Sequence, residues 1–377
     1  MIPLSVPNLA GNEWQYVKEC LDTSWVSSVG SFVNRMEEMS ASFSGVTGAV
    51  ATSNGTAALH ISLILAGVQA GDLVILPNIT FVAPANAITY MGARPLLMDV
   101  YEDTWELDVD LLEQFLIEEC ACNNGVCYHK LSGKRIPVII PVHVLGNMVN
   151  MEKLMPLAAK YHIAVIEDAT ESLGSTYKDK PAGSFGLFGC LSYNGNKIIT
   201  TGGGGMILTD NDKLAKEAKH LTTQAKADPL EYYHDKVGYN YRMVNILAAM
   251  GVAQMEQLPG FIQRKKEIAS LYNLGLKDIP GFKGQETTEH VTSNCWLYTA
   301  VFGQSKQLME YLAARDIQTR PFWVPMNRLP AFDADIYYNK TDIAGNIYST
   351  CLSLPCSTNI TDDEVAAVIE NIHQFYA

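Results

Sequence analysis

The chain has 377 residues, of which 48% are hydrophobic and 18% charged, so it can bury a large core and form one large and one smaller domain. Its 27 lysines and arginines against 40 aspartates and glutamates give a net charge of −13, which argues against a general surface for nucleic acid or for an anionic membrane. An anionic ligand therefore needs a local cluster of basic groups and backbone amides.

The amino-terminal part shows no membrane signal. Residues 1–6 contain no basic region followed by an apolar run, so we expect no signal peptide and a cytoplasmic protein. Residues 39–71 carry no formal charge, but Ser, Thr, Gly and Asn interrupt them, and the apolar part at 57–68 is too short to span a bilayer. We expect a strand, a turn and a buried helix there.

Through the first two-thirds of the chain, apolar runs rich in β-branched residues alternate with helical patterns. The predicted strands are 48–52, 73–76, 94–100, 137–144, 163–168, 189–193 and 205–209, and the predicted helices include 56–66, 108–118, 151–161 and 213–221. Near-continuous apolar strands separated by helices predict an α/β fold with a mainly parallel sheet covered on both faces. Ligands of such sheets bind beyond the carboxyl ends of the strands.

A turn of small residues at 53–57, Ser-Asn-Gly-Thr-Ala, follows the first predicted strand and opens a helix. Small residues let backbone amides approach an anion, the amino end of a helix favours negative charge, and the Thr56 hydroxyl can donate a hydrogen bond. The same pattern is often only a turn with a helix cap. Phe81 follows the next strand, where it either packs in the core or stacks on a planar ring.

An insertion from Cys120 to Arg135 holds Cys120, Cys122, Cys127 and His129. The spacing C-x-C-x4-C-x-H is not a familiar zinc pattern, and cysteines in a long chain of this kind are mostly reduced and packed. We therefore expect no metal here. Turn residues at 123–125, Asn-Asn-Gly, and at 132–133, Ser-Gly, favour a loop and a β-hairpin.

The stretch 191–205 is the most informative part of the chain. It holds a single lysine, Lys197, in an otherwise uncharged run, with Ser192 five residues before it and four glycines after it. A lysine that is surrounded by apolar and small residues is poorly hydrated. Poor hydration favours the neutral amine, which is the form that attacks aldehydes. Upstream, an apolar strand ends at Asp168. A Schiff-base lysine and a carboxylate for a pyridinium nitrogen are what pyridoxal phosphate (PLP) requires of its protein.

Each of these residues also has an ordinary interpretation. A lysine after a strand is usually a solvated loop residue, and an aspartate at a strand end is more often a helix cap. The pair, together with the phosphate-type turn at 53–57, predicts a PLP site.

The pattern changes after residue 244. A helical pattern at 247–274, with an interruption expected at Pro259-Gly260, leads into a smaller α+β domain. That domain is expected to contain strands near 295–302 and 350–355, a helix at 305–315, and a last helix that begins at Thr361, where Thr-Asp-Asp-Glu forms a capping box. The predicted domains are therefore 1–246 and 247–377.

With these motifs together, the chain resembles the DegT/StrS-type sugar aminotransferases, PLP enzymes of the aspartate-aminotransferase fold that act on nucleotide-linked keto sugars. The resemblance runs from Ile2-Pro-Leu and Trp25-Val-Ser-Ser-Val-Gly30 to Ile317-Gln-Thr-Arg320-Pro. It implies fold type I, with a mainly parallel sheet in the large domain and a smaller carboxyl-terminal α+β domain. It also implies PLP as the cofactor and an obligate homodimer with shared active sites.

The resemblance also implies roles for individual residues. The catalytic residues are Lys197, as the Schiff-base lysine and the general base and acid, and Asp168, as the partner of the pyridinium nitrogen. The other implied cofactor contacts are Gly55, Thr56, Ala57 and Ser192 at the phosphate, Phe81 on the ring, Glu171 near its 3-oxygen, and Asn240 reaching the phosphate in the partner subunit. The expected substrate contacts are Trp25, Ser28, His143, Arg242 and Arg320. For His143, at the end of an apolar strand, a buried structural role is an equal alternative.

Within the family, the chain looks most like the branch that aminates C4 of a UDP-linked 4-keto-6-deoxy-N-acetylhexosamine for legionaminic acid or bacillosamine synthesis, with L-glutamate as donor. The supporting features are the run at 194–205, the insertion at 120–135 and the sequence Pro-Val-His-Val-Leu-Gly-Asn at 141–147. Glu171 stands where the family often has Gln or His, and Gly203 stands where Glu is frequent. A different nucleotide keto sugar, such as GDP-4-keto-6-deoxymannose, is the alternative substrate.

Two other functions compete with this interpretation. In deoxysugar dehydratases of the family a histidine replaces the Schiff-base lysine, and the presence of Lys197 argues against that activity. A regulatory protein could retain the fold only to bind a ligand. The complete set of Lys197, Asp168 and Ser192 argues against it, because a binding module does not need the full catalytic group.

Overall fold

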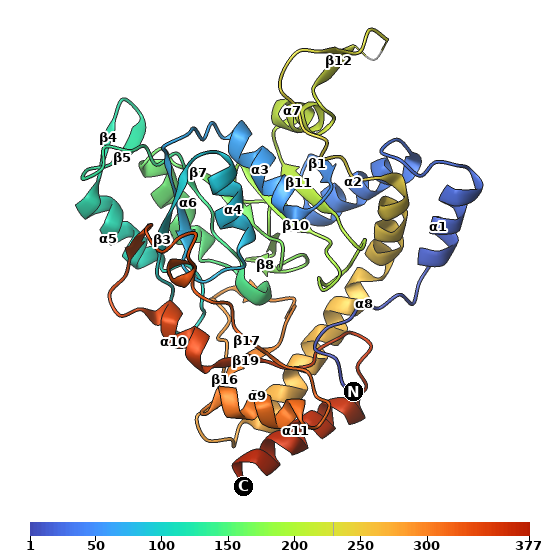
Figure 1. The fold of residues 1–377 in the computed structure, drawn as a ribbon, viewed down its shortest axis with the longest axis vertical. Coiled ribbons are helices and arrows are strands. Elements are labelled where there is room, and N and C mark those ends of the chain that lie inside the picture. The colour runs from blue at the N-terminus through green and yellow to red at the C-terminus, as the bar shows by residue number, and fades with distance from the viewer. Residues whose placement is uncertain (229) are drawn as a thin grey trace.

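The computed structural model describes residues 1–228 and 230–377, and its centre is an eight-stranded sheet (Figure 1). In sheet order the strands are β1 (Gly48–Thr52), β11 (Gly205–Thr209), β10 (Phe188–Ser192), β7 (Ala164–Asp168), β6 (Val138–Ile139), β2 (Leu73–Pro77), β3 (Arg94–Met98) and β18 (Ile336–Tyr338). The strands from β10 to β18 are parallel, and β11 is antiparallel to both of its neighbours. The predicted α/β fold with a mainly parallel sheet is confirmed.

Strand β6 is much shorter than the predicted 137–144. Only Val138 and Ile139 pair on both sides, with β2 and β7. Prolines 137 and 141 flank the pair, and a proline has no amide hydrogen to donate to a sheet. Beyond them the chain touches β7 once more, in a single bridge from Val142 to Asp168, before it turns toward the site.

Side-chain caps set where the helices that flank the sheet begin. Asn54, Asp108 and Asn150 accept hydrogen bonds from backbone amides in the first turn of the helices that follow them. These helices are α3 (Gly55–Leu65), α5 (Val109–Glu119) and α6 (Met151–Lys160), and the large domain also contains α1 (Glu13–Asp22), α2 (Ser31–Ser44), α4 (Ala83–Tyr90) and α7 (Asp212–Thr222). The predicted helices here are confirmed to within one residue at each end.

The long helix α8 (Asn245–Leu276) connects the two parts of the molecule without a break (Figure 1). The expected interruption at Pro259-Gly260 is wrong, because Pro259 lies inside the helix. Residues up to Phe261 belong to the large core, and residues from Ile268 onward belong to a second core. Packing at both ends therefore outweighs the hydrogen bond that the proline cannot make.

The second core belongs to a smaller α+β unit. Its sheet has the order β14 (Lys283–Gly284), β16 (Thr299–Val301), β19 (Cys351–Ser353), β17 (Arg320–Pro321), and helices α9 (Ser305–Ala313) and α11 (Asp362–Tyr376) cover it. The predicted capping box is confirmed, with Thr361 and Glu364 bonding to each other's backbone amides.

Two segments cross the predicted domain boundary at residue 246. Strand β18 lies in the carboxyl-terminal third of the chain, yet it extends the large sheet beside β3. At the other end, Ile2 pairs with Ile317, and Leu4 accepts a hydrogen bond from the amide of Cys356. The division into domains 1–246 and 247–377 therefore stays a prediction for the cores of the two units. It does not apply to β18 or to the first residues of the chain, which each pack against the other unit.

The insertion after α5 forms the predicted hairpin, from β4 (Cys120–Asn123) to β5 (Val126–His129). Its turn residues, Asn124 and Gly125, have φ values of 50° and 75°, which suit Asn and Gly. Within residues 1–228 and 230–377, no group of three or more His, Cys, Asp or Glu side chains is arranged to hold a metal ion.

The remaining elements are short. They are the strands β8 (Thr176–Tyr177), β9 (Lys180–Pro181), β12 (Lys226–Asp228), β13 (Tyr233–His234) and β15 (Val291–Thr292), the helix α10 (Ile343–Thr350), and 3-10 turns at Val144–Gly146 and Met326–Arg328. No helix in the described part of the chain is both long and apolar enough to cross a membrane.

Candidate active site

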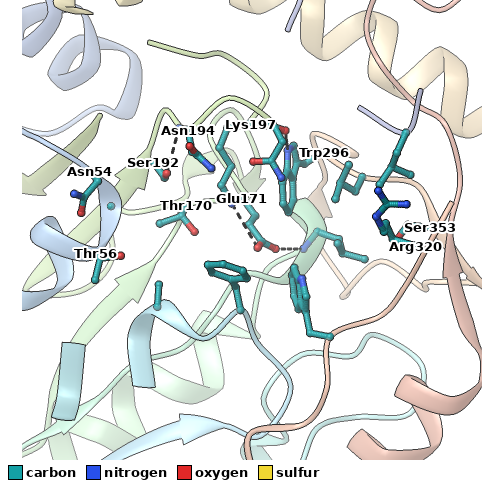
Figure 2. Close-up of a pocket in the computed structure, with 18 of the residues that line it drawn as sticks. Asn54, Thr56, Thr170, Glu171, Ser192, Asn194, Lys197, Trp296, Arg320 and Ser353 are labelled. Carbon is teal, nitrogen blue, oxygen red and sulfur yellow. Dashed lines mark hydrogen bonds and ion pairs between the residues drawn. The ribbon is translucent and has the colours of Figure 1, made fainter. Parts of the chain in front are cut away.

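A cavity of about 300 Å³ lies where the carboxyl ends of β7 and β10 meet the small domain (Figure 2). One wall comes from the start of α3, the loop after β7 and the segment 192–204. Trp296 and the segment 320–323 of the small domain form the opposite wall. The cavity therefore occupies the edge of the sheet where α/β proteins bind ligands.

The amino end of α3 opens into this cavity. Gly55 and Thr56 line it, and their amides, in the first turn, have no partner within the helix. The side chain of Asn54 accepts the amide hydrogen of Ala57 at 2.8 Å, and Ala57 is only 4% exposed. The amide of Ala57 thus serves the helix cap, and its role at the phosphate stays a prediction.

Ser192, at the end of β10, faces Gly55 across the cavity floor. A Cβ atom on residue 55 would lie 3.0 Å from the Ser192 Cβ and 3.3 Å from the Thr170 Cγ2, so only glycine lets the two segments approach this closely. Two helix amides, the hydroxyls of Thr56 and Ser192, and the positive end of an 11-residue helix together suit a phosphate group. The cradle fits the phosphate of PLP.

Asp168 ends β7, just before the loop whose Thr170 and Glu171 line the cavity, and is 3% exposed. Its Oδ1 accepts the amide hydrogen of Thr170 at 3.2 Å. Burial raises the pKa of Asp168, while the Thr170 hydrogen bond and the charge of Lys197 act in the opposite direction. A cationic ring nitrogen placed beside it is the kind of partner that holds such a carboxylate ionised.

Lys197 reaches the cavity and lies beside Glu171 (Figure 2), with 3.6 Å between its Nζ and the Glu171 Oε1. The Lys197 side chain is 12% exposed and that of Glu171 is 2% exposed. Glu171 also accepts the amide hydrogen of Leu145 at 2.8 Å. Burial outweighs these favourable contacts and raises the pKa of Glu171 to about 7. A carboxyl group that can take or release a proton at neutral pH therefore lies beside the lysine amine.

We expect Glu171→Gln to change how the stability of the apo-protein depends on pH. The pKa of Glu171 is about 7 in the folded chain against an ordinary value of 4.5, so the folded state binds its proton more tightly than the unfolded state. Its contribution to stability is therefore complete below pH 4.5 and is lost as the pH rises toward 7. The variant does not lose this contribution. Between pH 5 and pH 8, its free energy of unfolding should therefore rise by on the order of 3 kcal/mol relative to that of wild type.

Urea unfolding of both apo-proteins at these two pH values measures the difference. A gap between variant and wild type that stays constant with pH would show that Glu171 does not titrate in this range.

Trp296 is a site residue that sequence reasoning missed. The Lys197 amine lies 3.9 Å from the centroid of its indole ring, and the Trp296 Nε1–H donates to the carbonyl of Asn196 at 2.8 Å. The indole therefore holds the lysine from the small-domain side through a cation–π contact. Trp296 lies about a hundred residues from Lys197 along the chain, in a sequence that predicts only a strand. The residues around it form no motif that would indicate a binding site.

Phe81 lies in the cavity wall with its ring exposed, as its predicted stacking role requires. It is 56% exposed, and its ring centroid lies 6.5 Å from that of Trp323, which sequence reasoning also missed. Exposed aromatic rings at the edge of a cavity offer a planar ligand a stacking surface. The stacking role of Phe81 stays a prediction.

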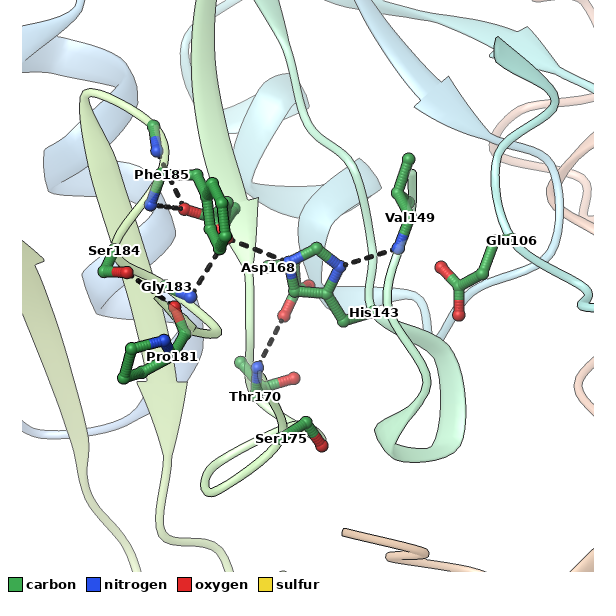
Figure 3. A network of polar contacts seen from close by, with 12 residues as sticks. Glu106, His143, Val149, Asp168, Thr170, Ser175, Pro181, Gly183, Ser184 and Phe185 are labelled. Atoms are coloured by element: carbon green, nitrogen blue, oxygen red, sulfur yellow. Dashed lines mark hydrogen bonds and ion pairs between the residues drawn. The ribbon is translucent and has the colours of Figure 1, made fainter. Parts of the chain in front are cut away.

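His143 does not line the cavity, and of its two predicted roles its position supports the buried structural one. It is fully buried, and its Nδ1 accepts the amide hydrogen of Val149 at 3.3 Å (Figure 3). That contact leaves the proton on Nε2, which lies 3.0 Å from the Glu167 Oε2. Glu167 also accepts amide hydrogens from 183, 185 and 186, so the pair fixes a buried turn next to Asp168.

Of the other predicted substrate contacts, only Arg320 lines the cavity. Arg242 does not line it: its guanidinium is paired with Glu37 at 2.6 Å and its side chain is 7% exposed, so its substrate contact stays a prediction. Trp25 and Ser28 lie in the loop between α1 and α2, away from the cavity, with Trp25 55% exposed. Asn240 is also outside the cavity of its own chain and is exposed at the surface.

The site combines a lysine amine, a buried carboxylate at a strand end and a phosphate cradle at a helix end, with a small domain on the opposite side. This combination defines a PLP-dependent enzyme of fold type I. The chain belongs to the DegT/DnrJ/EryC1/StrS aminotransferase family, whose sequence profile matches residues 7–373. The protein is thus a PLP-dependent aminotransferase, and the predicted family, fold and cofactor are confirmed.

Similar proteins cover nearly the whole chain. A GDP-perosamine synthase from Escherichia coli O157:H7 is 36% identical over 379 residues, which span 100% of this chain and 99% of that protein. A GDP-perosamine synthase from Caulobacter vibrioides is 36% identical over 382 residues, 99% of this chain and 98% of the relative. The aminotransferase TlmJ from Streptoalloteichus hindustanus superimposes with a TM-score of 0.89 at 26% identity, covering 99% of this chain and 98% of that structure.

Proposed function

We propose that this enzyme transfers the amino group of L-glutamate to the C4 ketone of a nucleotide-linked 4-keto-6-deoxy sugar in surface-glycan synthesis. The first candidate substrate is UDP-2-acetamido-2,6-dideoxy-hexos-4-ulose, on the way to legionaminic acid or bacillosamine. The observation that carries the proposal is the Lys197 amine, held between Glu171 and Trp296 in a cavity that Arg320 also lines. The reaction belongs in the cytoplasm, which agrees with eight cysteines that are all free thiols.

The site residues divide the work of amino transfer. Bound PLP supplies the electron sink that amino transfer needs. Lys197 is the base placed to take a proton from the donor's α-carbon and return it on the other side of the reaction. Glu171, with its pKa of about 7, can exchange a proton with that amine. Trp296 covers the amine on the small-domain side and excludes water from it.

The charge of the cavity supports a nucleotide-linked substrate. Arg320 lies in its wall on the small-domain side, in a protein whose net charge is −13, and a diphosphate is the anionic group that UDP- and GDP-linked sugars carry. Gly203 lines the same cavity, and a Cβ there would meet only the Ser53 carbonyl, at 4.0 Å. Because glycine stands where the family often has glutamate, no side chain from this position enters the cavity, which favours a sugar with a bulky substituent such as an acetamido group.

A GDP-linked 4-keto-6-deoxy sugar is the second candidate. It is favoured by the proteins named GDP-perosamine synthase, which are 36% identical to this chain across its length. The two candidates differ in the base and in the C2 substituent, so a direct competition between them decides the assignment.

A small panel of UDP- and GDP-linked 4-keto sugars, each supplied with glutamate, tests the proposal. We expect the UDP-linked N-acetyl sugar to give a 4-amino product and 2-oxoglutarate, with kcat/KM at least about 10-fold above the GDP-linked sugar. The reverse order would establish the second candidate. Turnover of neither by enzyme that retains PLP would contradict amination of such sugars.

We also propose that the enzyme is a homodimer in which Asn240 of one chain binds the cofactor phosphate of the other. Asn240 is exposed in its own chain and pairs with Thr223 in an isolated antiparallel bridge. A hydrogen bond from an amide to a charged phosphate contributes roughly 1.5–3 kcal/mol. Asn240→Ala should therefore weaken PLP retention by about 10- to 100-fold without unfolding the protein. Dialysis against cofactor-free buffer measures the retention.

Subunit mixing tests the shared site more sharply. Inactive Lys197→Ala is mixed with a severely impaired Asn240 variant under conditions that allow exchange. If each site takes Lys197 from one chain and Asn240 from the other, one site of the mixed dimer carries both lesions and the other carries neither, so activity returns in part. Lys197→Ala mixed with itself is the control. No recovery despite demonstrated exchange would place Asn240 in the same site as its own Lys197.

A further inference from the structure

The hairpin β4–β5 gathers three of the eight cysteines of the chain at one edge of the large domain, and amino transfer has no use for them (Figure 1). Cys120 and Cys127 are buried, and Cys122 is exposed. The Cys122 thiol donates a weak hydrogen bond to the carbonyl of Tyr161 at 3.7 Å. Of the eight cysteines, all within the described part of the chain, Cys122 alone is exposed.

The register of the hairpin places Cys122 directly opposite Cys127. The two-residue turn at 124–125 closes on the pair Asn123 and Val126, and a turn of this length is flanked by a hydrogen-bonded pair. The pairs then alternate, so Cys122 and Cys127 occupy a non-hydrogen-bonded position, where the Cα atoms are about 4.5 Å apart. A disulfide needs about 4.4–6.8 Å between Cα atoms. This pair can therefore be joined without moving the backbone.

Cys120 is excluded by the same geometry. It lies opposite His129, which makes it a diagonal neighbour of Cys127. Diagonal neighbours in an antiparallel pair are about 7–8 Å apart, and cysteines more than about 7 Å apart at Cα cannot be bridged unless the backbone moves. Cys120 is therefore too distant from Cys127 to replace Cys122 in a disulfide.

We propose that the hairpin is a reversible thiol–disulfide exchange site, in which Cys122 and Cys127 react with a low-molecular-weight disulfide. The Cys122 thiolate attacks one sulfur of the external disulfide, whose S–S bond breaks and releases one thiol. The Cys127 thiolate then attacks the Cys122 sulfur and releases the second thiol. The two protein cysteines lose two electrons and two protons, and the external disulfide gains both.

Exposure and burial assign the two roles. The exposed Cys122 is the one an external disulfide can reach, and the buried Cys127 behind it is protected from direct attack. Burial and the neighbouring Cys127 raise the pKa of the Cys122 thiol, and the Cys120 thiol together with burial raises that of Cys127, so both groups rest as thiols rather than thiolates. Such a state fits a reducing compartment and a change that is reversed by added thiol.

Peptide mapping of the full-length, folded enzyme after treatment with oxidised glutathione tests the proposal. We expect a Cys122–Cys127 disulfide, detected by mass spectrometry as a loss of two hydrogens from the hairpin peptide and reversed by reduced glutathione. Cys127→Ser should stop at a glutathione adduct on Cys122, because the second attack is missing. Cys122→Ser should show neither product. Cys120→Ser is the matched control and should react like wild type.

Four outcomes would overturn the proposal. They are a stable glutathione adduct on wild-type Cys122, a disulfide that includes Cys120, an unmodified Cys122 under conditions that oxidise a model dithiol, and a disulfide that forms only in urea. Circular dichroism before and after treatment shows that the protein stays folded. Because the hairpin variants leave the cavity residues untouched, these results do not depend on which sugar the enzyme aminates.

Discussion

Lys197→Ala should abolish amino transfer and remove the visible absorbance of the bound cofactor. Lys197 is the one lysine among the described residues that line the cavity, so no neighbour can take its place. Its amine is both the attachment point for PLP and the base beside the reacting carbon, and losing a group with two such roles costs on the order of 10⁴-fold or more in rate. Steady-state assays with glutamate and the preferred sugar measure the loss.

A chemical experiment locates the attachment point. Borohydride treatment of the wild-type enzyme should fix the cofactor to a peptide that contains Lys197, and the label on any other lysine would contradict the assignment. Lys197→Arg is the matched control, because arginine keeps a positive charge beside Glu171 but offers no nucleophilic amine. It should be as inactive as the alanine variant, whereas the exposed Lys306→Ala should behave like wild type.

Local chemistry made much of the fold predictable from the sequence. Strands β1 and β11 lie at the predicted bounds, because each is a short apolar run between turn residues. The last helix begins after Thr361, as predicted, because its capping box consists of four consecutive residues and can be recognised from the sequence alone. The positions of Gly55, Ser192 and Lys197 around one cavity follow from the rule that ligands bind at the carboxyl ends of parallel strands.

What the sequence did not reveal depends on contacts between distant segments. The helix α8 continues through Pro259 because two separate cores anchor its ends, and a local pattern contains neither core. His143 and Arg242 looked like polar groups available to a ligand, but Glu167 and Glu37, far away in sequence, hold them. Trp296 meets Lys197 only because the small domain packs against this edge of the sheet, about a hundred residues further along the chain.

Asp168→Asn isolates the charge of the strand-end carboxylate from its structural role. In the wild-type structure the Thr170 amide donates to the Asp168 Oδ1 at 3.2 Å. Asparagine keeps an oxygen that can accept this hydrogen bond, so the turn after β7 should be preserved. It cannot neutralise a protonated ring nitrogen. We expect a loss of about 3–5 kcal/mol of transition-state stabilisation, about 10²- to 10⁴-fold in kcat, with PLP still bound. Single-turnover rates with glutamate alone measure the effect on the first half of the reaction.

The stability of the apo-protein separates this interpretation from a simple folding defect. Burial raises the pKa of Asp168, so the folded apo-protein bears a cost for ionising it at neutral pH. A neutral amide removes that cost, and apo Asp168→Asn should therefore unfold at the same or a higher urea concentration than apo wild type. Lower activity with equal or greater stability is the result that a charge partner of the cofactor requires. Wild-type rates would mean that the ring nitrogen pairs elsewhere, and an unstable apo-variant would mean that Asp168 holds the fold.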